Sequence, residues 1–465
     1  MSPKEQAPSD ATRRLGKGAA VLSVGIASAG LFTYLFFAVA SHTLSRSEYG
    51  SITLLWSAVF IIVSVLYRPV EQLLSRTIAE RQALGLQDLG PLRVAAKIQL
   101  ALGAAFAVAA LIFRGPIESG LFSGDSTLYW ILIVAILAYA ASYFARGYLA
   151  GQRRFGLYGA LVTFESTSRL LFAIAFAVGI ATSHSVPAAG IAAAPLISLA
   201  VLPWAIGHHL RRNGQGRETV GYAQDRVEAS PEKFSLAHGG RFAAAVLIIM
   251  FSEQTLLNAG PLAVKATAGT AGVALAGFAF NILLIARAPL QLFQAVSTSI
   301  LPHLTNVRVT EGADAFRRSV RITLLAVVGF ATLVVLVMAT IGPQLMHIFF
   351  SKKFDYDRWG LVLVAVGMGL YLSATTLNQA ALAQGQARRA ATCWLTTAAL
   401  FVAWLFMPVL GEVRRVEVGY VVAAGLLYGL LYIVYRRPVE HPEDVPTPGS
   451  VEELEAQLAS ADEAT

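Results

Sequence analysis

Long apolar segments recur along almost the whole chain, and they restrict the folds that it can adopt. A helix needs about 20 mostly apolar residues to cross the hydrocarbon core of a bilayer. Segments of about this length are separated by polar breaks such as 42–49 and 211–233. The sequence therefore predicts an all-α, polytopic membrane protein with about twelve transmembrane helices. The predicted spans are 18–41, 50–70, 98–113, 128–146, 157–181, 187–207, 241–260, 270–290, 321–342, 359–380, 390–410 and 416–435.

The low charge content argues against a soluble protein. A soluble chain is roughly a quarter charged and about half apolar, whereas this one is 14% charged and 56% hydrophobic over 465 residues. That charge would not cover the surfaces of the two or three domains that a soluble chain of this length forms. The net charge of +8 would suit a nucleic-acid binder if it formed a patch. Here the Lys and Arg residues fall between apolar segments, so we expect no nucleic-acid partner.

No enzyme motif is present in the sequence. It contains neither a phosphate-binding GxxxxGK[ST] loop, nor HExxH, nor GxSxG. The single cysteine, Cys393, lies in an apolar segment, which rules out an intramolecular disulfide and argues against a metal cluster. The adjacent His208 and His209 lie in a basic segment and are interpreted as a solvated pair. We therefore expect no enzymatic activity, no catalytic residue, no cofactor and no metal site.

The distribution of basic residues predicts the orientation in the membrane. Cytoplasmic segments of membrane proteins are rich in Lys and Arg. With a cytoplasmic N-terminus, 26 of the 36 basic residues fall in inner segments and eight in outer ones. The first apolar segment follows Arg13, Arg14 and Lys17, but it is too long for the apolar core of a signal peptide. We expect an uncleaved, multi-pass protein of the cytoplasmic membrane with both termini in the cytoplasm.

Changes in composition divide the chain into five predicted regions. The last of them holds eight acidic residues, four prolines and no Lys or Arg, a composition typical of solvated and mostly disordered segments. Whether it binds a partner is left open. The regions are a cytoplasmic tail at 1–17, a first six-helix bundle at 18–210, a cytoplasmic linker at 211–240, a second six-helix bundle at 241–437 and the acidic tail at 438–465.

The two halves resemble each other at matching places. The second span ends with Arg68 and Pro69, and the eighth ends with Arg287 and Pro289. Gly-Gln-Arg-Arg follows the fourth span, and Gln-Gly-Gln-Ala-Arg-Arg follows the tenth. A parallel repeat of this kind is typical of transporters, whose substrate site lies between the repeats. Both prolines can kink their helices, which would otherwise continue to about residues 79 and 300.

Charged residues at membrane depth are the main candidates for function, because burying a charge in lipid is costly. At 1.5 Å per residue, Glu165 lies roughly 12 Å and Arg169 roughly 18 Å from the cytoplasmic end of the fifth span. Their i,i+4 spacing lets them pair. Two interpretations stay open, a neutralised ion pair that joins helices and the polar lining of a central pathway. Arg68 and Arg287 either extend to the interface or act in the pathway.

Three short stretches resemble the polysaccharide flippases. Ser41-His-Thr-Leu-Ser-Arg-Ser-Glu-Tyr-Gly50 resembles their turn L-G-x-x-x-Y-G, with Ser45 in place of the first glycine. The segment from Arg146 to Tyr158 resembles R-G-x-x-x-G-x-x-R-F-x-x-Y, and Pro289 with Pro302-His-Leu resembles the end of their eighth span. These proteins belong to the multidrug/oligosaccharidyl-lipid/polysaccharide exporter superfamily.

The resemblance implies two six-helix bundles that open alternately to either side of the membrane. It also implies flipping of a polyprenyl-pyrophosphate-linked saccharide for cell-surface polysaccharide synthesis. The expected partners are that substrate, membrane lipids, and the glycosyltransferases or polymerase of the pathway. Arginine binds phosphate through a bidentate fork, so we expect Arg169 and Arg287 to face one cavity from opposite halves. The candidate substrate-binding residues are Arg68, Arg146, Arg169, Arg287, Glu165, Glu253, Asn258 and Asn281.

Two other functions remain as alternatives. A cation-coupled multidrug exporter of the same superfamily would need a membrane carboxylate. The first span has none, but Glu165 could serve. A membrane glycosyltransferase or polymerase would need an acidic site in a sizeable outer loop. The predicted outer loops are short, and Asp355 with Asp357 is the only close acid pair in the largest of them, which makes this alternative the weakest.

Overall fold

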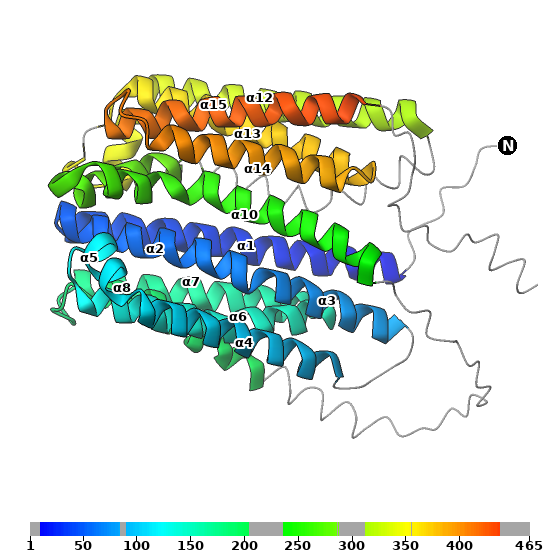
Figure 1. Ribbon diagram of the computed structural model, residues 1–465, viewed down its shortest axis with the longest axis horizontal. Helices are drawn as coiled ribbons and strands as arrows, with labels where there is room; N and C mark the ends of the chain where they lie inside the picture. Colours follow the sequence, from blue (N-terminus) through cyan, green and yellow to red (C-terminus); the bar gives the residue numbers. More distant parts are fainter. Residues whose placement is uncertain are drawn as a thin grey trace, which may run out of the picture.

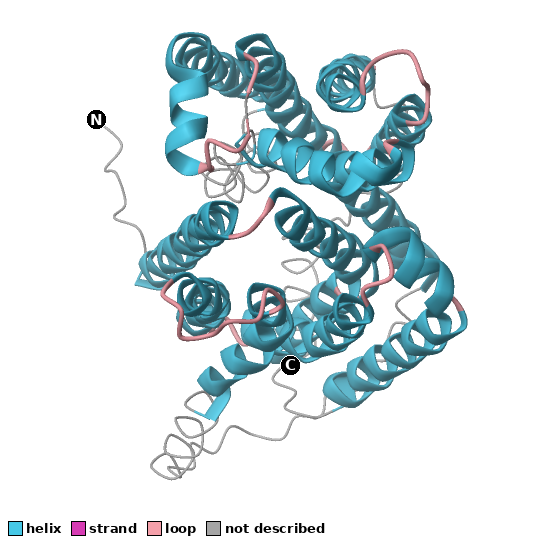
Figure 2. Ribbon diagram, turned by 90° about the vertical axis from the view of Figure 1, so that its left-hand side faces the viewer, coloured by secondary structure: helices cyan, strands magenta, loops and turns pink. Residues whose placement is uncertain are grey.

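The computed structural model describes residues 10–83, 90–203, 236–285, 287, 312–354 and 356–437. Every regular element within these residues is a helix (Figures 1 and 2). The first half contains α1 (Asp10–Thr43), α2 (Arg46–Leu66), α3 (Arg68–Ala83), α4 (Gly90–Ile112), α5 (Arg114–Phe122), α6 (Ser126–Gly151), α7 (Phe155–Ala177), α8 (Val186–Ser198) and η1 (Leu199–Val201). The second half contains α10 (Leu236–Thr267), η2 (Gly269–Ala271), α12 (Gly312–Phe349), α13 (Arg358–Ala383), α14 (Ala387–Leu405) and α15 (Glu412–Arg436).

A helix is found at each predicted span. Nine helices in the described part of the chain are long and apolar enough to cross a membrane. Two shorter apolar helices, Val186–Val201 and Gly269–Ile285, and α14 account for the remaining predicted spans. The second span is interrupted at Tyr67 and continues as α3, with Pro69 in its first turn. The corresponding continuation after Pro289 lies outside the described residues.

The helices form two groups that follow the two halves of the sequence. In the first half, α1 packs on α7, and α6 packs on α3 and α8. In the second, α13 packs on α12 and α15, and α14 packs on α10. The two groups lie side by side in Figure 1, where α2 and α10 form the principal contact between them. The predicted linker is described only from Leu236, where α10 already begins, and the acidic tail lies outside the described residues.

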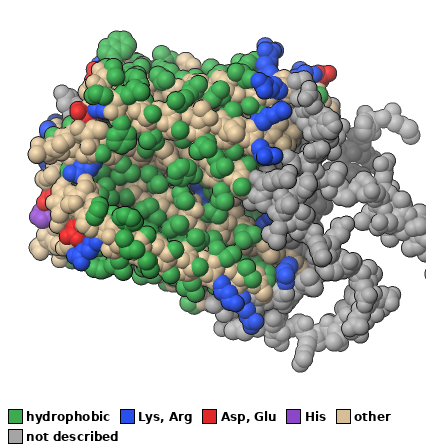
Figure 3. Space-filling model, in the orientation of Figure 1, with side chains coloured by type: hydrophobic (Ala, Val, Ile, Leu, Met, Phe, Trp, Pro, Cys, Tyr) green, Lys and Arg blue, Asp and Glu red, His purple; other side chains and the backbone are tan. Residues whose placement is uncertain are grey.

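The surface has the distribution of polarity that a bilayer requires. Figure 3 shows hydrophobic side chains over the middle of the molecule and most charged side chains at its two ends. The most apolar span, α12, has a mean hydropathy of 2.7, yet only 17% of that window is buried within the protein. A soluble protein would bury such a helix, so its exposed face is suited to lipid.

Side-chain caps fix where several helices begin. Ser45 accepts a hydrogen bond from the Glu48 backbone N–H, and the Glu48 carboxylate accepts one from the Ser45 N–H. This reciprocal pair satisfies two backbone groups that the helix leaves open at its start. Asp125 and Asp357 cap α6 and α13 more simply, through one carboxylate each. At Ser45, the residue that replaces the flippase glycine is thus the one that begins α2.

Glycines let helices approach closely within the first half. A Cβ atom at Gly147 of α6 would lie 2.8 Å from the Glu71 carbonyl oxygen of α3, and one at Gly151 would lie 2.7 Å from Ile78 Cβ. The two glycines are four residues apart and therefore lie on one face of the helix. Small residues with this spacing allow backbones to pack directly in membranes, where there is no hydrophobic force between helices.

We expect Gly151→Ala to lower the stability of the protein by about 1–3 kcal/mol, because the added methyl group overpacks a tight contact between the helices. The measurement is the thermal unfolding midpoint of the purified protein in detergent. Gly429→Ala is the matched control, since a Cβ atom there meets nothing within 4 Å. Equal midpoints for the two variants would contradict the proposed role of this contact.

Candidate functional site

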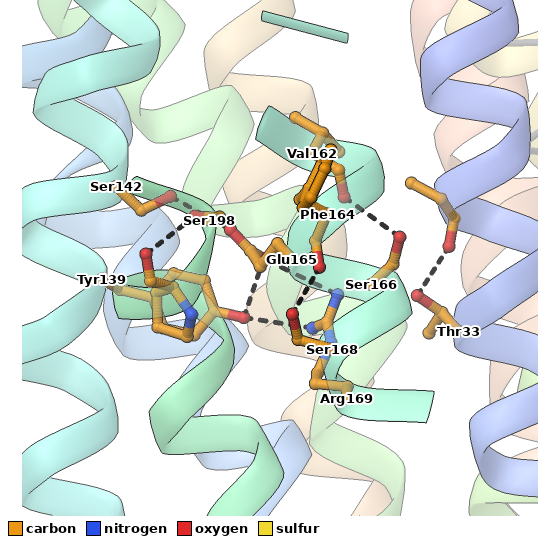
Figure 4. A network of polar contacts seen from close by, with 12 residues as sticks. Thr33, Tyr139, Ser142, Val162, Phe164, Glu165, Ser166, Ser168, Arg169 and Ser198 are labelled. Atoms are coloured by element: carbon orange, nitrogen blue, oxygen red, sulfur yellow. Dashed lines mark hydrogen bonds and ion pairs between the residues drawn. The ribbon is translucent and has the colours of Figure 1, made fainter. Parts of the chain in front are cut away.

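A buried polar network surrounds Glu165 in the first half (Figure 4). Arg146 of α6 donates from Nη2 to Glu165 Oε2 at 2.5 Å, and Arg169 Nη2 lies 3.6 Å from Oε1. Tyr139 and Ser142 of α6 donate their hydroxyls to the same carboxylate at 3.1 and 3.0 Å. Glu165 therefore has two cationic and two neutral partners, and its negative charge is neutralised within the protein.

The predicted pair of Glu165 and Arg169 forms, but it is not the shortest contact of the carboxylate. Arg169 also donates from Nη1 to the Tyr139 hydroxyl at 3.1 Å. Both residues of the predicted pair are almost fully buried, at 2% and 4% exposure. No sequence pattern indicates that Arg146 is the closer partner, since this depends on how α6 packs against α7. With two arginines and one glutamate, the network keeps one net positive charge.

A second group of charged residues lies where α3 meets α6 and α7. Tyr158 donates its hydroxyl to Glu71 Oε1 at 2.8 Å. Arg68 interacts electrostatically with Glu71 and, across the two halves, with Glu253. Glu253 in turn accepts a hydrogen bond from the Tyr371 hydroxyl at 3.1 Å. Arg68 thus lies within the influence of carboxylates from both halves.

In the second half, Arg287 has no such neutralisation. Its Nη2 donates to the Asn258 side-chain oxygen at 3.2 Å, and its guanidinium lies 5.7 Å from the Phe280 ring centroid. Asn258 is oriented by its own hydrogen bond to Gln254 Oε1 at 3.1 Å. The buried Nε of Arg287 has no hydrogen-bond partner, and no carboxylate among the described residues lies within ion-pair distance. The other described groups that interact with Arg287 are the neutral side chains of Tyr371 and Tyr420. A buried cation whose described neighbours carry no negative charge retains the capacity to bind an anion.

A cavity of about 500 Å³ lies between the two halves. The described residues that line it are almost entirely apolar, with Thr33 and Tyr34 as polar exceptions and Arg287 as the single charged residue among them. Both halves contribute, since the lining residues belong to α1 and α2 and to the segment 284–287, α12 and α13. They are Ala27, Gly30, Leu31, Thr33, Tyr34, Trp56, Leu284, Ile285, Arg287, Leu333, Val334, Val337, Met338, Leu345, Phe349, Leu361, Val364 and Ala365.

Trp56 separates the Glu165 network from this cavity. The Arg169 guanidinium lies 4.8 Å from the centroid of the Trp56 ring, and Trp56 itself lines the cavity. Phe60 stacks on the same indole with a centroid distance of 4.1 Å. Arg287 therefore lines the cavity itself, whereas Arg169 does not line it and contacts the wall residue Trp56.

The remaining predicted residues fall at different places. Asn281 joins Tyr49 and Tyr356 near one end of the bundle. Glu253 and Asn258 share α10, whereas Arg68 and Arg146 lie with the groups around Glu71 and Glu165. The substrate-binding role of these residues stays a prediction. Sequence reasoning missed the aromatic wall formed by Trp56 and Tyr34, because aromatic residues occur in nearly every span.

Comparison with known proteins identifies the fold. No family model matches the chain, and no curated protein matches it by sequence. Among solved structures, an inward-facing multidrug resistance MATE family transporter of the MOP superfamily is similar, with a TM-score of 0.63 and 15% identity over 90% of this chain and 97% of that one. The outward-facing form of a MATE family transporter of this superfamily gives 0.58, with 15% identity over 91% and 95%. The MATE multidrug transporter DinF-BH, solved as a complex, gives 0.59, with 15% identity over 94% and 100%.

The chain thus has the fold of the MATE transporters, which consists of two helical bundles. The solved structures that share this fold include both inward-facing and outward-facing forms of transporters of the MOP superfamily. The similar structures are those of transporters, not of enzymes. The substrate is a separate question, because structural similarity at this level of identity establishes the fold alone.

The Glu165 network predicts an order of stability among three variants. Arg169→Ala leaves the short Arg146–Glu165 pair intact, so it should cost least. Arg146→Ala leaves the longer Arg169 contact as the remaining ion pair of the carboxylate. Its loss of stability should approach the roughly 3–5 kcal/mol that breaking a buried ion pair costs. Glu165→Gln removes the nearest counter-charge of two buried arginines and leaves only the interaction of Arg146 with Glu71, so it should cost most. Thermal unfolding midpoints in detergent measure this order, and a larger loss for Arg169→Ala than for Arg146→Ala would refute it.

Proposed function

We propose that the protein is an alternating-access exporter of an amphipathic, anionic substrate. The observation that carries this proposal is the chemistry of the cavity between the halves, in which Arg287 faces apolar walls and has no carboxylate of the described residues within ion-pair distance. A cation in such surroundings favours an anionic group, and the walls favour an apolar body. Arg287 would hold the anionic group, with Trp56 and Tyr34 beside the apolar part.

The contacts between the halves are consistent with a state that is closed on one side. The hydrogen bonds that join described residues of the two halves gather at the end that carries the α1–α2 turn. In the orientation predicted from the basic residues, this end faces outward. The structure would then represent the inward-facing state, which agrees with the higher TM-score to the inward-facing relative.

A polyprenyl-pyrophosphate-linked saccharide is the member of this substrate class that the motifs favour. Its pyrophosphate would be bound by Arg287, since Arg binds phosphate oxygens strongly, and its lipid would remain in apolar surroundings. The protein would then act in the cytoplasmic membrane beside the glycosyltransferases or polymerase of polysaccharide synthesis. This substrate rests on the three flippase-like stretches, namely 41–50, 146–158 and 289–304.

A cation-coupled multidrug exporter is the second candidate, and the comparisons favour it over the saccharide flippase. The three similar solved structures reported above are all multidrug transporters by description. Glu165 is poorly suited as the coupling carboxylate, because two arginines bind it. Glu253, with one tyrosine donor and the influence of Arg68, is the better candidate for that role.

The central test is Arg287→Ala in proteoliposomes. Hydrogen bonds to charged groups contribute about 1.5–3 kcal/mol, so loss of the guanidinium should weaken binding of an anionic amphiphile by about 10- to 100-fold. Arg287→Lys should retain part of the affinity. Arg317→Ala is the control, because its side chain is 67% exposed and pairs with Asp314. Unchanged affinity in Arg287→Ala would remove the observation on which the proposal depends.

A transport assay separates the two substrates. Reconstituted protein is supplied with a labelled polyprenyl-pyrophosphate sugar, and in parallel with anionic and cationic dyes under a proton or sodium gradient. Movement of the sugar lipid between leaflets, with loss in Arg287→Ala, supports the flippase. The drug exporter is supported if the gradient drives dye efflux, if Glu253→Gln abolishes this efflux, and if folded Glu165→Gln protein retains it. Efflux restricted to cationic dyes would contradict the anionic substrate class itself.

A further inference from the structure

The two halves meet at the end with the α1–α2 turn through a set of contacts that the transport site does not use. Tyr49 of α2 donates its hydroxyl to the Asn281 side-chain oxygen, and the Asn281 amide donates to the Tyr356 hydroxyl at 2.8 Å. Tyr49 and Asn281 are both fully buried, at 0% exposure. One asparagine thus connects α2 of the first half to the segment before α13 of the second.

A backbone contact accompanies these hydrogen bonds. A Cβ atom at Gly50 would lie 1.9 Å from the Val273 carbonyl oxygen, and one at Gly277 would lie 3.2 Å from Gly50 Cα. Gly50 belongs to α2, whereas Val273 and Gly277 belong to the helix Gly269–Ile285. The two helices therefore touch backbone to backbone, and any side chain at Gly50 would force them apart.

The segment between α12 and α13 closes over the end of α1. The Ser351 N–H donates to Ser41 Oγ at 3.3 Å, and Lys353 Nζ donates to the Leu44 carbonyl oxygen at 2.9 Å. The lysine thereby satisfies a carbonyl group that the C-terminus of α1 leaves open. These contacts join parts of the chain that are about 300 positions apart in sequence.

Two residues that line the cavity lie next to these contacts. Tyr34 and Phe349 both line the cavity, and their rings pack edge to face with centroids 5.2 Å apart. Directly beyond them, Tyr34 packs on Phe350, which is followed in the chain by Ser351. The cavity lining and the Ser41–Ser351 contact are thus joined through Phe349 and Phe350, which directly precede Ser351 in the chain.

We propose that Tyr49, Gly50, Asn281 and the Ser41–Ser351 contact form a latch that holds the two halves together at this end and must open once in each transport cycle. This assigns Asn281 to closure instead of substrate binding. The inference rests on the proposed alternating-access function for its role in transport, but the latch itself can be tested without a substrate. Gly50 is required for closure, because only a glycine allows α2 to reach the opposite helix.

The test is a reversible cross-link across the latch. Ser41→Cys with Ser351→Cys places two thiols at a contact that the closed state brings together, and native Cys393 is replaced by Ser. An engineered protease site in the 211–235 segment makes the bond visible, because cross-linked halves stay joined on a non-reducing gel after cleavage. We expect efficient cross-linking on mild oxidation, and a several-fold lower yield when Gly50→Ala is added. Gly329→Ala is the control, since a Cβ atom there meets nothing within 4 Å.

Undiminished cross-linking in folded Gly50→Ala protein would overturn the latch. If Gly50→Ala does not fold, Asn281→Ala replaces it, because this variant removes both hydrogen bonds and adds no bulk. It too should lower the cross-linking yield, and no change would again count against the latch. Transport gives the second readout, in which the cross-linked protein should be inactive and should recover with reductant. Full transport by cross-linked protein would show that this end need not open.

Failure of the proposed function would look different. In that case the cross-link would form and would respond to Gly50→Ala, but no substrate would move in either the reduced or the oxidised protein. The closure would then stand as a property of the fold, while its place in a transport cycle would be refuted.

Discussion

Lipid cannot hydrate a charge, and the arrangement of ionic groups in this protein follows from that constraint. An ion at membrane depth is stable only with a partner or a polar cavity beside it. Glu165 therefore has three hydrogen-bond donors on α6 and an ion-pair partner on α7, and the two arginines among them contact Tyr139, Tyr143 and Trp56 in turn. The polar network thus holds together helices whose outer faces have no driving force to associate in lipid.

The two halves share a fold but treat their arginines differently. In the first half, Arg146 and Arg169 are committed to a carboxylate inside the bundle, so their charge serves structure. In the second half, Arg287 has an amide partner and faces a cavity in which the other described lining residues are uncharged. The cation that faces the cavity therefore belongs to one half. The apolar walls come from both halves, which is why the cavity depends on how the bundles meet.

The sequence predicts well what depends on local patterns. Hydropathy over about 20 residues located a helix at every predicted span, and the i,i+4 spacing of Glu165 and Arg169 correctly indicated an ion pair. It could not predict that Arg146 would be the closer partner of Glu165, since that requires the rotation of α6 against α7. The bond between Tyr49 and Asn281 spans 232 positions and follows from contact between the halves. No periodic pattern encodes such a contact, so Asn281 could be recognised as deep but not as part of a closure.

The position of Trp56 in the cavity wall has a consequence for its fluorescence. Its indole lies against the Arg169 cation within the protein and borders the cavity that Arg287 enters. Indole emission responds to the local electric field, and here one source of that field is a fixed charge held by Glu165. An anion that arrives beside Arg287 would change the field from the cavity side while the protein side stays constant. In a variant in which Trp56 is the one tryptophan kept of the six, its emission would therefore report occupancy of the cavity without an attached label.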